Sequence, residues 1–312
     1  MRLVFMGTPE IALPVLKAVS SRHEVVAVYT RPDAYSGRGR ELAQSAIKKE
    51  ASKLGIPVIQ PLNFKDGKNI SVLQDLQPEV IVVVAYGIIL PKAVLEIPRL
   101  GCINVHFSVL PRYRGASPVA GAILAGDRFT GVSIMLMETG VDTGPILSIS
   151  QLPVFDWDTT LSLGQRLSGI SGGLIIDVLE AWNRREIILR PQNEAAATYS
   201  GIIHKEDGLI SWNEEAALIW RKARAYHPWP GIYTTWRGKM LKLLSVEPVS
   251  HHSQEKPGSV ISFGGTSDMN VGVVTGKGIL GIKKIQLEGK KEVLTADFIR
   301  GQRDFIGSVL PD

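Results

Sequence analysis

Three polar residues with the chemistry of acyl transfer stand near the middle of the chain. Asn104 and His106 lie in the run Gly101-Cys-Ile-Asn-Val-His-Phe107, and Asp142 lies in Gly140-Val-Asp-Thr-Gly-Pro145. An amide can donate a hydrogen bond to an oxyanion, an imidazole can give or take a proton, and a carboxylate can hold the imidazole. We therefore predict that these three residues serve one catalytic site.

The run around Asn104 has the features of a buried strand that ends in a loop. It is short, rich in β-branched and aromatic residues, and bounded by Gly and Pro. Asn104 and His106 are two positions apart, so their side chains project from the same face of an extended strand. Asp142 follows the next strand, which places all three residues at strand ends of one predicted sheet, where catalytic residues gather in open parallel sheets.

Each of the three residues also has a structural interpretation when it is taken alone. His106 could be held by a backbone carbonyl, Asn104 could cap a strand end, and Asp142 could bond its own backbone in a turn. Neither Cys102 nor Ser108 is an evident nucleophile, because Cys102 precedes Asn104 by two positions on the strand and no separate base is assigned to Ser108. The combination favours direct transfer between two bound substrates, with a substrate amine as the attacking group.

The order of apolar segments predicts an α/β domain followed by a smaller β domain. Strand-like and helix-like segments alternate from Arg2 to about Arg190, which indicates a Rossmann-like, doubly wound and mostly parallel sheet. After Arg190 the pattern changes to one helix and then short strands, which fits a small OB-like β-barrel. We place the catalytic domain and its linker at residues 1–203, and the β-barrel domain at residues 204–312.

The individual elements follow from apolar runs and helical spacing. The expected strands are Leu3–Met6, Glu24–Tyr29, Val80–Ala85, Cys102–Phe107, Gly131–Leu136, Tyr233–Trp236, Met240–Leu244, Gly258–Ser262, Val271–Thr275 and Ile279–Ile285. The expected helices are Ile11–Val19, Ser117–Leu124, Leu161–Arg185 and Glu214–Tyr226.

Composition narrows the class of protein. The chain has 312 residues, of which 45% are hydrophobic and 21% charged, as in ordinary soluble globular proteins. Its single cysteine, Cys102, excludes an intrachain disulfide, and the N-terminus lacks the apolar run of a signal peptide. No apolar stretch approaches the roughly 20 residues that span a bilayer. We expect a cytoplasmic protein with no membrane partner, whose net charge of +5 favours a polyanion.

Three further patterns of the sequence bear on nucleotide, metal and phosphate binding. Gly7-Thr-Pro-Glu10 lacks the glycines of a dinucleotide-binding loop, so nucleotide binding is disfavoured there. The histidines are scattered, and His251-His252 reads as a solvated loop, so no metal is expected. A basic segment around Ser36–Gly39 fits a surface loop and phosphate contact about equally well; its cations are Arg31, Arg38, Arg40, Lys48 and Lys49.

The chain resembles the methionyl-tRNA formyltransferase family over essentially its whole length. The similarity is carried by Asn104-Val-His106, Ser108-Val-Leu-Pro111, Arg112–Pro118 and Glu138–Pro145, which resemble the shared core of the 10-formyltetrahydrofolate-dependent formyltransferases. The resemblance implies that Asn104, His106 and Asp142 are catalytic and that 10-formyltetrahydrofolate is the formyl donor. It implies neither a metal nor a nicotinamide.

The resemblance also implies binding residues for both substrates. The folate residues are Ser108, Val109, Leu110, Pro111, Tyr86 and Gly87, with Val109 where the family more often has leucine. The segment Thr30–Arg40 is similar to the tRNA-contacting insertion of the family, with Arg38 and Arg40 as tRNA-binding residues. The insertion departs from the family pattern after Arg40, where Glu-Leu-Ala-Gln-Ser-Ala-Ile stands in place of a lysine pair and a proline-containing segment.

The activity implied is transfer of a formyl group from 10-formyltetrahydrofolate to the α-amino group of initiator methionyl-tRNA, for translation initiation. Separately from the resemblance, we expect a monomer. Residues 227–303 resemble the family's C-terminal barrel, which contributes basic contacts to tRNA. Two alternatives stay open: a formyltransferase for a small amine such as a ribonucleotide or amino sugar, and a folate- or RNA-binding regulator without catalysis. A turnover assay with defined acceptors separates the three.

Overall fold

The computed structural model describes residues 1–36, 41–251, 253–266 and 269–311. The chain separates into two compact units. The first unit comprises Met1–Pro118, Arg128–Pro153 and Ser162–Gly201, and the second comprises Val119–Asp127, Val154–Leu161 and Ile202–Asp312. Two short segments that precede residue 162 therefore belong with the C-terminal part. The domain boundary expected after residue 203 stays a prediction.

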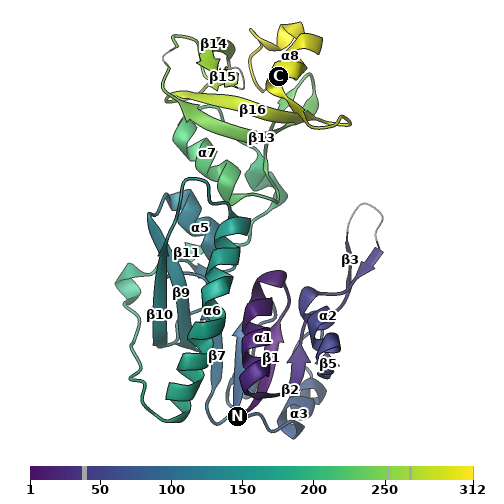
Figure 1. The fold of residues 1–312 in the computed structure, drawn as a ribbon, viewed down its shortest axis with the longest axis vertical. Coiled ribbons are helices and arrows are strands. Elements are labelled where there is room, and N and C mark those ends of the chain that lie inside the picture. Colours follow the sequence, from purple (N-terminus) through teal and green to yellow (C-terminus); the bar gives the residue numbers. More distant parts are fainter. Residues whose placement is uncertain (37–40, 252, 267–268, 312) are drawn as a thin grey trace. The chain divides into compact units, whose positions relative to one another are not determined.

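The first unit is built on a seven-stranded sheet with the order β10-β9-β7-β6-β1-β2-β5 (Figure 1). Five of these strands are parallel: β1 (Arg2–Gly7), β2 (Glu24–Tyr29), β5 (Val58–Ile59), β6 (Val80–Val84) and β7 (Cys102–His106). Strand β9 (Phe129–Leu136) runs antiparallel to both of its neighbours, β7 and β10 (Ile146–Pro153). The expected Rossmann-like, mostly parallel sheet is confirmed.

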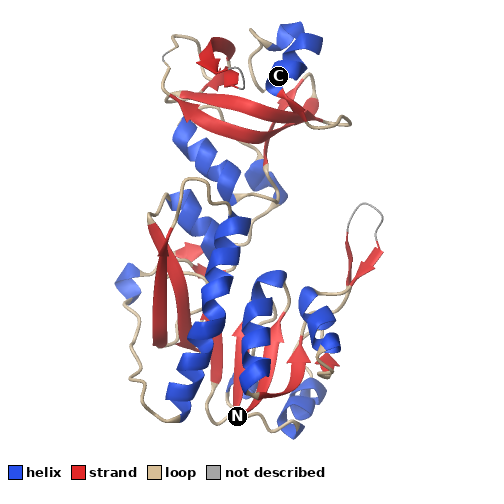
Figure 2. Cartoon of the chain, in the orientation of Figure 1, coloured by secondary structure: helices blue, strands red, loops and turns tan. Residues whose placement is uncertain are grey.

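Helices cover the faces of this sheet (Figure 2). They are α1 (Leu13–Arg22), α2 (Ala46–Lys53), α3 (Gly67–Asp75), α4 (Lys92–Leu95) and α6 (Thr160–Asn183). Side chains cap two of them, because Ser45 accepts from the backbone N–H of Lys48 in α2 and Asp66 accepts from that of Asn69 in α3. The sheet is buried on both sides, and all five residues of β6 are apolar and buried.

Helices α1 and α6 lie side by side over one face of the sheet (Figure 1). A Cβ atom at Gly172 of α6 would lie 3.1 Å from the carbonyl oxygen of Pro14 in α1, so glycine permits this close approach. The hydroxyl of Ser168 also donates to the carbonyl oxygen of Ile11, at 2.5 Å. The long helix predicted over Leu161–Arg185 therefore packs along the N-terminal part of the unit.

The second unit has α5 (Pro118–Ala125), α7 (Ala216–Ala225), α8 (Thr295–Gly301) and an antiparallel sheet. Its strand order is β12-β13-β16-β15-β14, with β17 paired to β16. The strands are β12 (Ile232–Trp236), β13 (Lys239–Val249), β14 (Val260–Thr266), β15 (Met269–Val274), β16 (Ile279–Leu287) and β17 (Val293–Leu294). The small C-terminal β domain expected from the pattern of short strands is confirmed.

Short elements complete the fold. The strands β3 (Ala34–Ser36) and β4 (Glu41–Ala43) form an antiparallel pair, and β8 (Arg114–Gly115) pairs in parallel with β11 (Tyr199–Ser200). Single turns of 3₁₀ helix occur at Glu10–Ala12, Glu194–Ala196, Lys205–Gly208 and Arg303–Phe305. None of these elements was predicted as a strand or helix of its own, because two to four residues carry too little periodic signal.

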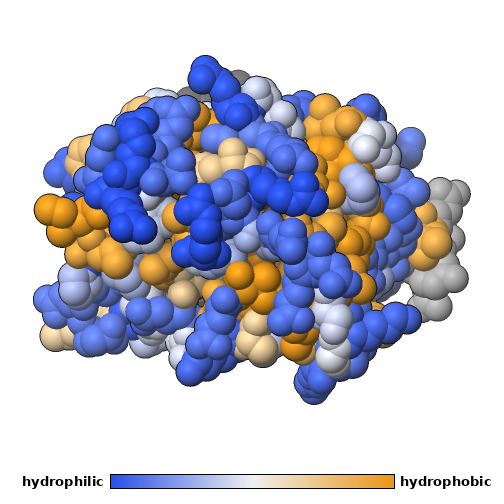
Figure 3. All heavy atoms as spheres, turned by 90° about the horizontal axis from the view of Figure 1, so that it is seen from below, coloured by the Kyte–Doolittle hydropathy of each residue, from blue (hydrophilic) through white to orange (hydrophobic). Residues whose placement is uncertain are grey.

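Hydrophilic residues cover most of the face seen in Figure 3, with smaller apolar patches between them. Scattered exposed apolar residues are normal for a globular surface, and the large apolar clusters of this chain are buried. Within the part of the chain that the structure describes, no helix combines the length and the apolar character needed to cross a membrane.

Candidate active site

The structure brings Asn104, His106 and Asp142 together in the first unit. Asn104 Nδ2 donates a 3.2 Å hydrogen bond to Asp142 Oδ1, and His106 Nδ1 lies 3.6 Å from Asp142 Oδ2. The side chains of His106 and Asp142 are only 6% and 15% exposed. A carboxylate, an amide and an imidazole therefore share one largely buried site, where their electrostatic interactions are weakly screened.

Asp142 reaches this site by a different route from the one expected. Strand β9, which precedes it, is antiparallel to β7, with Leu136 opposite Ile103 and Ser133 opposite His106. The carboxyl end of β9 therefore lies beside the start of β7, at the wrong edge for a shared strand-end site. The loop after β9 instead folds back until its carboxylate lies beside Asn104. Asp142 follows a strand of this sheet, as expected, but that strand runs antiparallel to β7, and an apolar run does not reveal strand direction.

The carboxylate of Asp142 is held by two donors. Besides Asn104, the backbone N–H of Gly115 donates to Asp142 Oδ2 at 2.8 Å. Asp142 itself has φ of +52°, a left-handed conformation that aspartate tolerates better than most residues. The Asn104 amide donates one Nδ2 hydrogen to Asp142, and its other Nδ2 hydrogen has no acceptor among the described residues. That hydrogen is available to a substrate oxygen.

The tautomer of His106 follows from its neighbours. Its Nε2 lies 2.9 Å from the carbonyl oxygen of Tyr113, and because a carbonyl can only accept, Nε2 carries the proton. In the neutral ring, Nδ1 is therefore the basic nitrogen, and it faces Asp142. Burial lowers the pKa of His106, and this outweighs the opposing effects of the Asp142 carboxylate and the Tyr113 carbonyl. The neutral, proton-accepting form is favoured.

A segment that the sequence analysis treated as linker holds the Asp142 loop. We call residues 190–200 the strap. Gln192 Nε2 donates to the carbonyl oxygens of both Asp142 and Gly144, each at 2.8 Å. Thr198 Oγ1 accepts from the N–H of Tyr113 at 2.9 Å, next to the carbonyl that orients His106. The strap therefore contacts the backbone on both sides of the trio Asn104, His106 and Asp142.

Arg114 joins the strap to the loop that follows β7. Its side chain is fully buried, and it donates to Gln192 Oε1 at 2.9 and 3.1 Å and to the Glu194 carboxylate at 2.7 and 2.8 Å. The hydrogen bonds to the Glu194 carboxylate raise the pKa of Arg114 above its ordinary value. The same bonds lower the pKa of Glu194. Arg114 thus fixes the amide of Gln192, whose other end holds the Asp142 loop.

Sequence reasoning missed the strap residues. Arg114 lies in the motif Arg112–Pro118, where it was given no role. Gln192 and Thr198 lie after Arg190, where the sequence showed only that the pattern of elements changes. No periodicity marks a segment whose contacts are made to residues 50 to 85 positions away. The one available signal was the polar run Gln192-Asn-Glu194 directly after a proline, which is equally typical of a loop.

The predicted folate residues lie in two loops that follow β6 and β7. Gly87 is exposed with φ of +80°, whereas the Tyr86 side chain is only 2% exposed and packs in the core. The carbonyl oxygen of Tyr86 accepts from the hydroxyl of Thr8 at 2.9 Å. The ring of Tyr86 is therefore part of the core beneath this loop and is not exposed in it.

The loop after β7 is fixed by hydrogen bonds of buried hydroxyl groups. Ser108 Oγ donates to the carbonyl oxygen of Arg112 at 2.6 Å, and Ser133 Oγ donates to that of Ser108 at 2.7 Å while accepting from the N–H of Leu110 at 3.0 Å. Leu110 is buried, and Val109 and Pro111 are partly buried. The loop is therefore a rigid support whose shape does not depend on solvent.

Apolar side chains lie in and between the loops that follow β6, β7 and β9. Met137 packs against the cluster that holds Tyr86 and also against the one that holds Leu110. Exposed apolar side chains stand in the loops after β6 and β9, where Ile89 is 89% and Val141 61% exposed. Apolar side chains together with exposed backbone groups such as those of Gly87 are what small-molecule sites offer a heteroaromatic ring.

The predicted tRNA-binding residues Arg38 and Arg40 lie outside the described residues. The β3–β4 pair that flanks them is anchored by Lys48, which forms a 2.6 Å ion pair with Asp33 and donates to Gln60 at 2.9 Å. The hydrogen bond from Lys48 is the main cause of a lowered pKa at Asp33. Lys48, one of the cations of the basic segment, thus has a structural partner. Among the described residues, no group of three or more His, Cys, Asp or Glu could hold a metal ion.

Comparisons with known proteins agree with this geometry. The formyl transferase family model matches residues 1–179, and the model of the formyl transferase C-terminal domain matches residues 202–303. The N-formyltransferase of Helicobacter canadensis, solved with folinic acid and dTDP-3-aminofucose, has a TM-score of 0.66 at 19% identity over 91% of this chain and 98% of that chain. HypX of Aquifex aeolicus with tetrahydrofolic acid has a TM-score of 0.63 at 17% identity over 96% and 47%. These likenesses show the fold alone.

Curated relatives are much more similar in sequence. The methionyl-tRNA formyltransferase of Legionella pneumophila (strain Paris) is 47% identical over 298 residues, which cover 95% of this chain and 94% of the relative. That of Dehalococcoides mccartyi (strain ATCC BAA-2266 / KCTC 15142 / 195) is 44% identical over 310 residues, or 98% and 97% of the two chains. The chain therefore belongs to the methionyl-tRNA formyltransferase family.

Proposed function

We propose that this protein transfers the formyl group of 10-formyltetrahydrofolate to the α-amino group of initiator methionyl-tRNA, for translation initiation. The observation that carries the proposal is the meeting of Asn104, His106 and Asp142 in one buried site of a chain from this family. The small-amine alternative has weaker support, since the N-formyltransferase of Helicobacter canadensis, solved with dTDP-3-aminofucose, is only 19% identical. The presence of all three residues in one site speaks against a regulator without catalysis.

His106 takes the proton that the amine loses. An α-amine has a pKa of about 7.7 to 8.0, so a useful neutral fraction exists near pH 7. As its nitrogen bonds to the formyl carbon, the proton passes to Nδ1 of His106, and the imidazolium formed is stabilised by Asp142 Oδ2 at 3.6 Å. When the bond between the formyl carbon and the folate nitrogen breaks, the same proton returns to that leaving nitrogen.

Asn104 stabilises the tetrahedral intermediate. The Nδ2 hydrogen not used by Asp142 donates to the oxygen that gains negative charge as the amine attacks. Because the amide is already fixed by its bond to Asp142, it needs no reorganisation when the charge develops. The folate supplies the activated one-carbon group, and the side chains of this chain supply orientation and electrostatics.

The substrate-binding residues complete the proposal. The folate site is formed by Gly87 and the backbone of Tyr86 together with the rigid loop Ser108–Pro111. Arg38 and Arg40, with basic residues of the C-terminal domain, contact tRNA phosphates, so the affinity for tRNA falls as salt rises. Affinity that stayed flat between about 50 and 200 mM salt would sink this part of the proposal. The monomeric state and the cytoplasmic setting stay predictions.

The test is a formylation assay with defined acceptors. Purified protein is incubated with 10-formyltetrahydrofolate and either initiator methionyl-tRNA, elongator methionyl-tRNA or an amino sugar nucleotide, and formylated product is measured. We expect initiator-selective product that is lost in His106→Ala. Product with the amino sugar nucleotide alone would support the small-amine enzyme, and folate binding without any product would support the regulator.

A further inference from the structure

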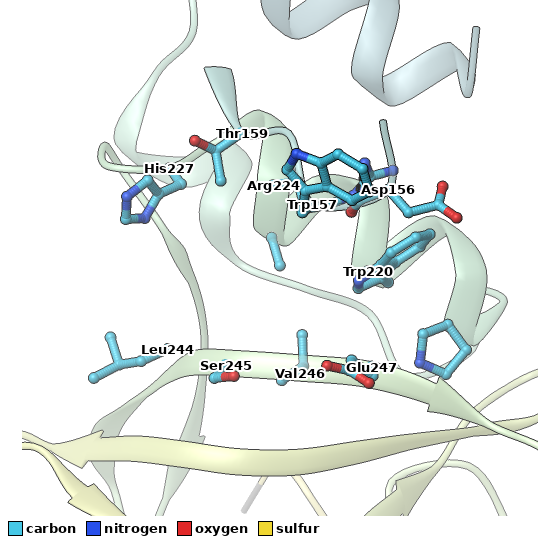
Figure 4. Close-up of a pocket in the computed structure, with 12 residues that line it drawn as sticks. Asp156, Trp157, Thr159, Trp220, Arg224, His227, Leu244, Ser245, Val246 and Glu247 are labelled. Atoms are coloured by element: carbon cyan, nitrogen blue, oxygen red, sulfur yellow. Dashed lines mark hydrogen bonds between the residues drawn. The ribbon is translucent and has the colours of Figure 1, made fainter. Parts of the chain in front are cut away.

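The second unit contains a groove that has no part in the chemistry of the trio. Its volume is about 680 Å³, within the range of small-molecule sites. We call it the aromatic groove. Helix α7, residues 156–159 and strand β13 form its walls, all from the second unit (Figure 4). Its lining side chains include Trp157, Trp220, Arg224, His227 and Glu247.

Trp157 offers an open stacking face in this groove. Its indole is stacked on Phe155 with ring centroids 4.5 Å apart and planes 16° from parallel, which covers one face. Trp157 is nevertheless 73% exposed, so the opposite face is open to solvent. Exposed indoles that are supported from behind are rare on monomeric surfaces and common where a flat ligand stacks.

Arg224 holds the walls of the groove in place. Its guanidinium lies 4.0 Å from the ring centroid of Trp220, and its Nη1 donates to the carbonyl oxygens of Phe155 and Asp156 at 3.2 and 3.1 Å. The hydroxyl of Thr160 also donates to the carbonyl oxygen of Ala225, at 2.5 Å. These bonds attach the segment that bears Trp157 to α7, so the stacking face is formed before any ligand arrives.

The charges in the groove select what can enter. Asp156 and Glu247 place exposed carboxylates at its walls. Arg224 is the one Lys or Arg among the described lining residues, and it is already engaged by backbone carbonyls and the Trp220 ring. The described lining residues thus carry two carboxylates against one guanidinium, so a phosphate gains little there, whereas a neutral heteroaromatic ring would gain stacking without repulsion. The groove is therefore matched to a base and not to a sugar–phosphate backbone.

We propose that the aromatic groove binds an unpaired nucleobase of the RNA substrate, stacked on the open face of Trp157. The proposal rests on the proposed function, because the acceptor named there is an RNA. Single-stranded ends and loops of RNA present bases that can be splayed out onto aromatic side chains. The groove thus adds sequence-tolerant affinity, in contrast to the salt-dependent phosphate contacts of basic residues.

The test compares Trp157→Ala and Trp157→Phe with a matched control, Trp229→Ala. Trp229 is 57% exposed, lies in the same unit and does not line the groove. The dissociation constant of initiator methionyl-tRNA is measured for each full-length protein, after thermal melts have checked that it is folded. We expect roughly 5- to 150-fold weaker binding for Trp157→Ala, most of the affinity retained in Trp157→Phe, and no change in the control.

A second measurement separates a base from a polyanion. Single-stranded RNA should quench the tryptophan fluorescence of the wild-type protein, and that quenching should be lost in Trp157→Ala, whereas heparin, which has no bases, should not reproduce it. Unchanged tRNA affinity in Trp157→Ala overturns the groove proposal. Trp157-dependent tRNA binding by a wild-type protein that formylates no tRNA would instead overturn the proposed function and leave the groove supported.

Discussion

The candidate active site and the aromatic groove differ in how far their side chains are buried and held by hydrogen bonds. At the active site, Asp142 accepts hydrogen bonds from Asn104 and Gly115, His106 Nε2 donates to the Tyr113 carbonyl oxygen, and the side chains of His106 and Asp142 are mostly buried. In the groove, Trp157 is 73% exposed and one face of its ring is uncovered. The first arrangement fixes atoms for chemistry, and the second leaves surface for a large ligand.

This difference predicts which measured quantity a substitution in each region should change. A proton transfer needs donor and acceptor at fixed positions, so changes around Asp142 should lower the turnover number and leave the affinity for tRNA intact. A stacking surface contributes affinity before the chemical step, so changes at Trp157 should act on tRNA binding. The following predictions test the active-site half of this contrast.

The largest effect is expected for His106→Ala. Loss of the group that takes and returns the proton should lower kcat by roughly 100- to 10,000-fold, the usual range for a positioned acid–base residue. The affinity for initiator methionyl-tRNA, measured by filter binding, should change little. Strongly weakened tRNA binding with kcat preserved would remove His106 from the chemistry.

Asn104→Ala is expected to follow. The change removes the Nδ2 donor proposed for the oxyanion, and loss of one such donor costs roughly 100- to 1000-fold in kcat. Single-turnover rates with saturating folate and tRNA report this step directly. A decrease of less than about fivefold in a folded variant would mean that another group stabilises the intermediate.

A smaller effect is expected for Gln192→Ala, because it acts through the position of Asp142. Removal of the amide frees the carbonyl oxygens of Asp142 and Gly144, and the loosened carboxylate should cost about 10- to 100-fold in kcat. As Asp142 moves away, the pKa of His106 should fall further, so the acid limb of the pH profile should shift to lower pH. Gln151→Ala, at an exposed position of β10, is the matched control. A loss of stability with no change in the pH profile would reduce Gln192 to a structural role.

The smallest effect concerns stability and pH. Because burial lowers the pKa of His106 below its ordinary value of 6.5, the unfolded chain binds more protons at acid pH than the folded chain does. The stability contributed by the neutral ring is complete above pH 6.5 and is lost as the pH falls through the folded-state pKa. The melting temperature of the wild type should therefore fall more between about pH 7 and pH 5 than that of His106→Gln. Parallel curves would contradict the lowered pKa.

Much of the fold could be predicted because its signals are local. The five apolar residues of β6 and the helical spacing of α6 identify those elements without any tertiary information. The direction of β9 could not be predicted, because a buried strand has the same apolar pattern in either orientation. The parallel direction expected for the strands was therefore not found at β9, the strand that precedes Asp142.

The candidate site divides in the same way. Asn104 and His106 were placed together by the period of a strand, and residue type suggested their chemistry. Gln192 was not found, because its contact with Asp142 spans 50 residues and depends on the buried Arg114 between the two segments. The exposed Trp157 was not singled out, because solvent exposure is a property of the folded chain.

The strap determines where a fragment of this protein that keeps the candidate active site can end. A fragment ending at residue 179, where the N-terminal family match ends, would lack Gln192, Glu194 and Thr198. The guanidinium of Arg114 would then lose its carboxylate and amide partners, and the Asp142 loop would lose the two hydrogen bonds from Gln192. Any stand-alone catalytic fragment of this chain has to extend to residue 201, past the end of the strap.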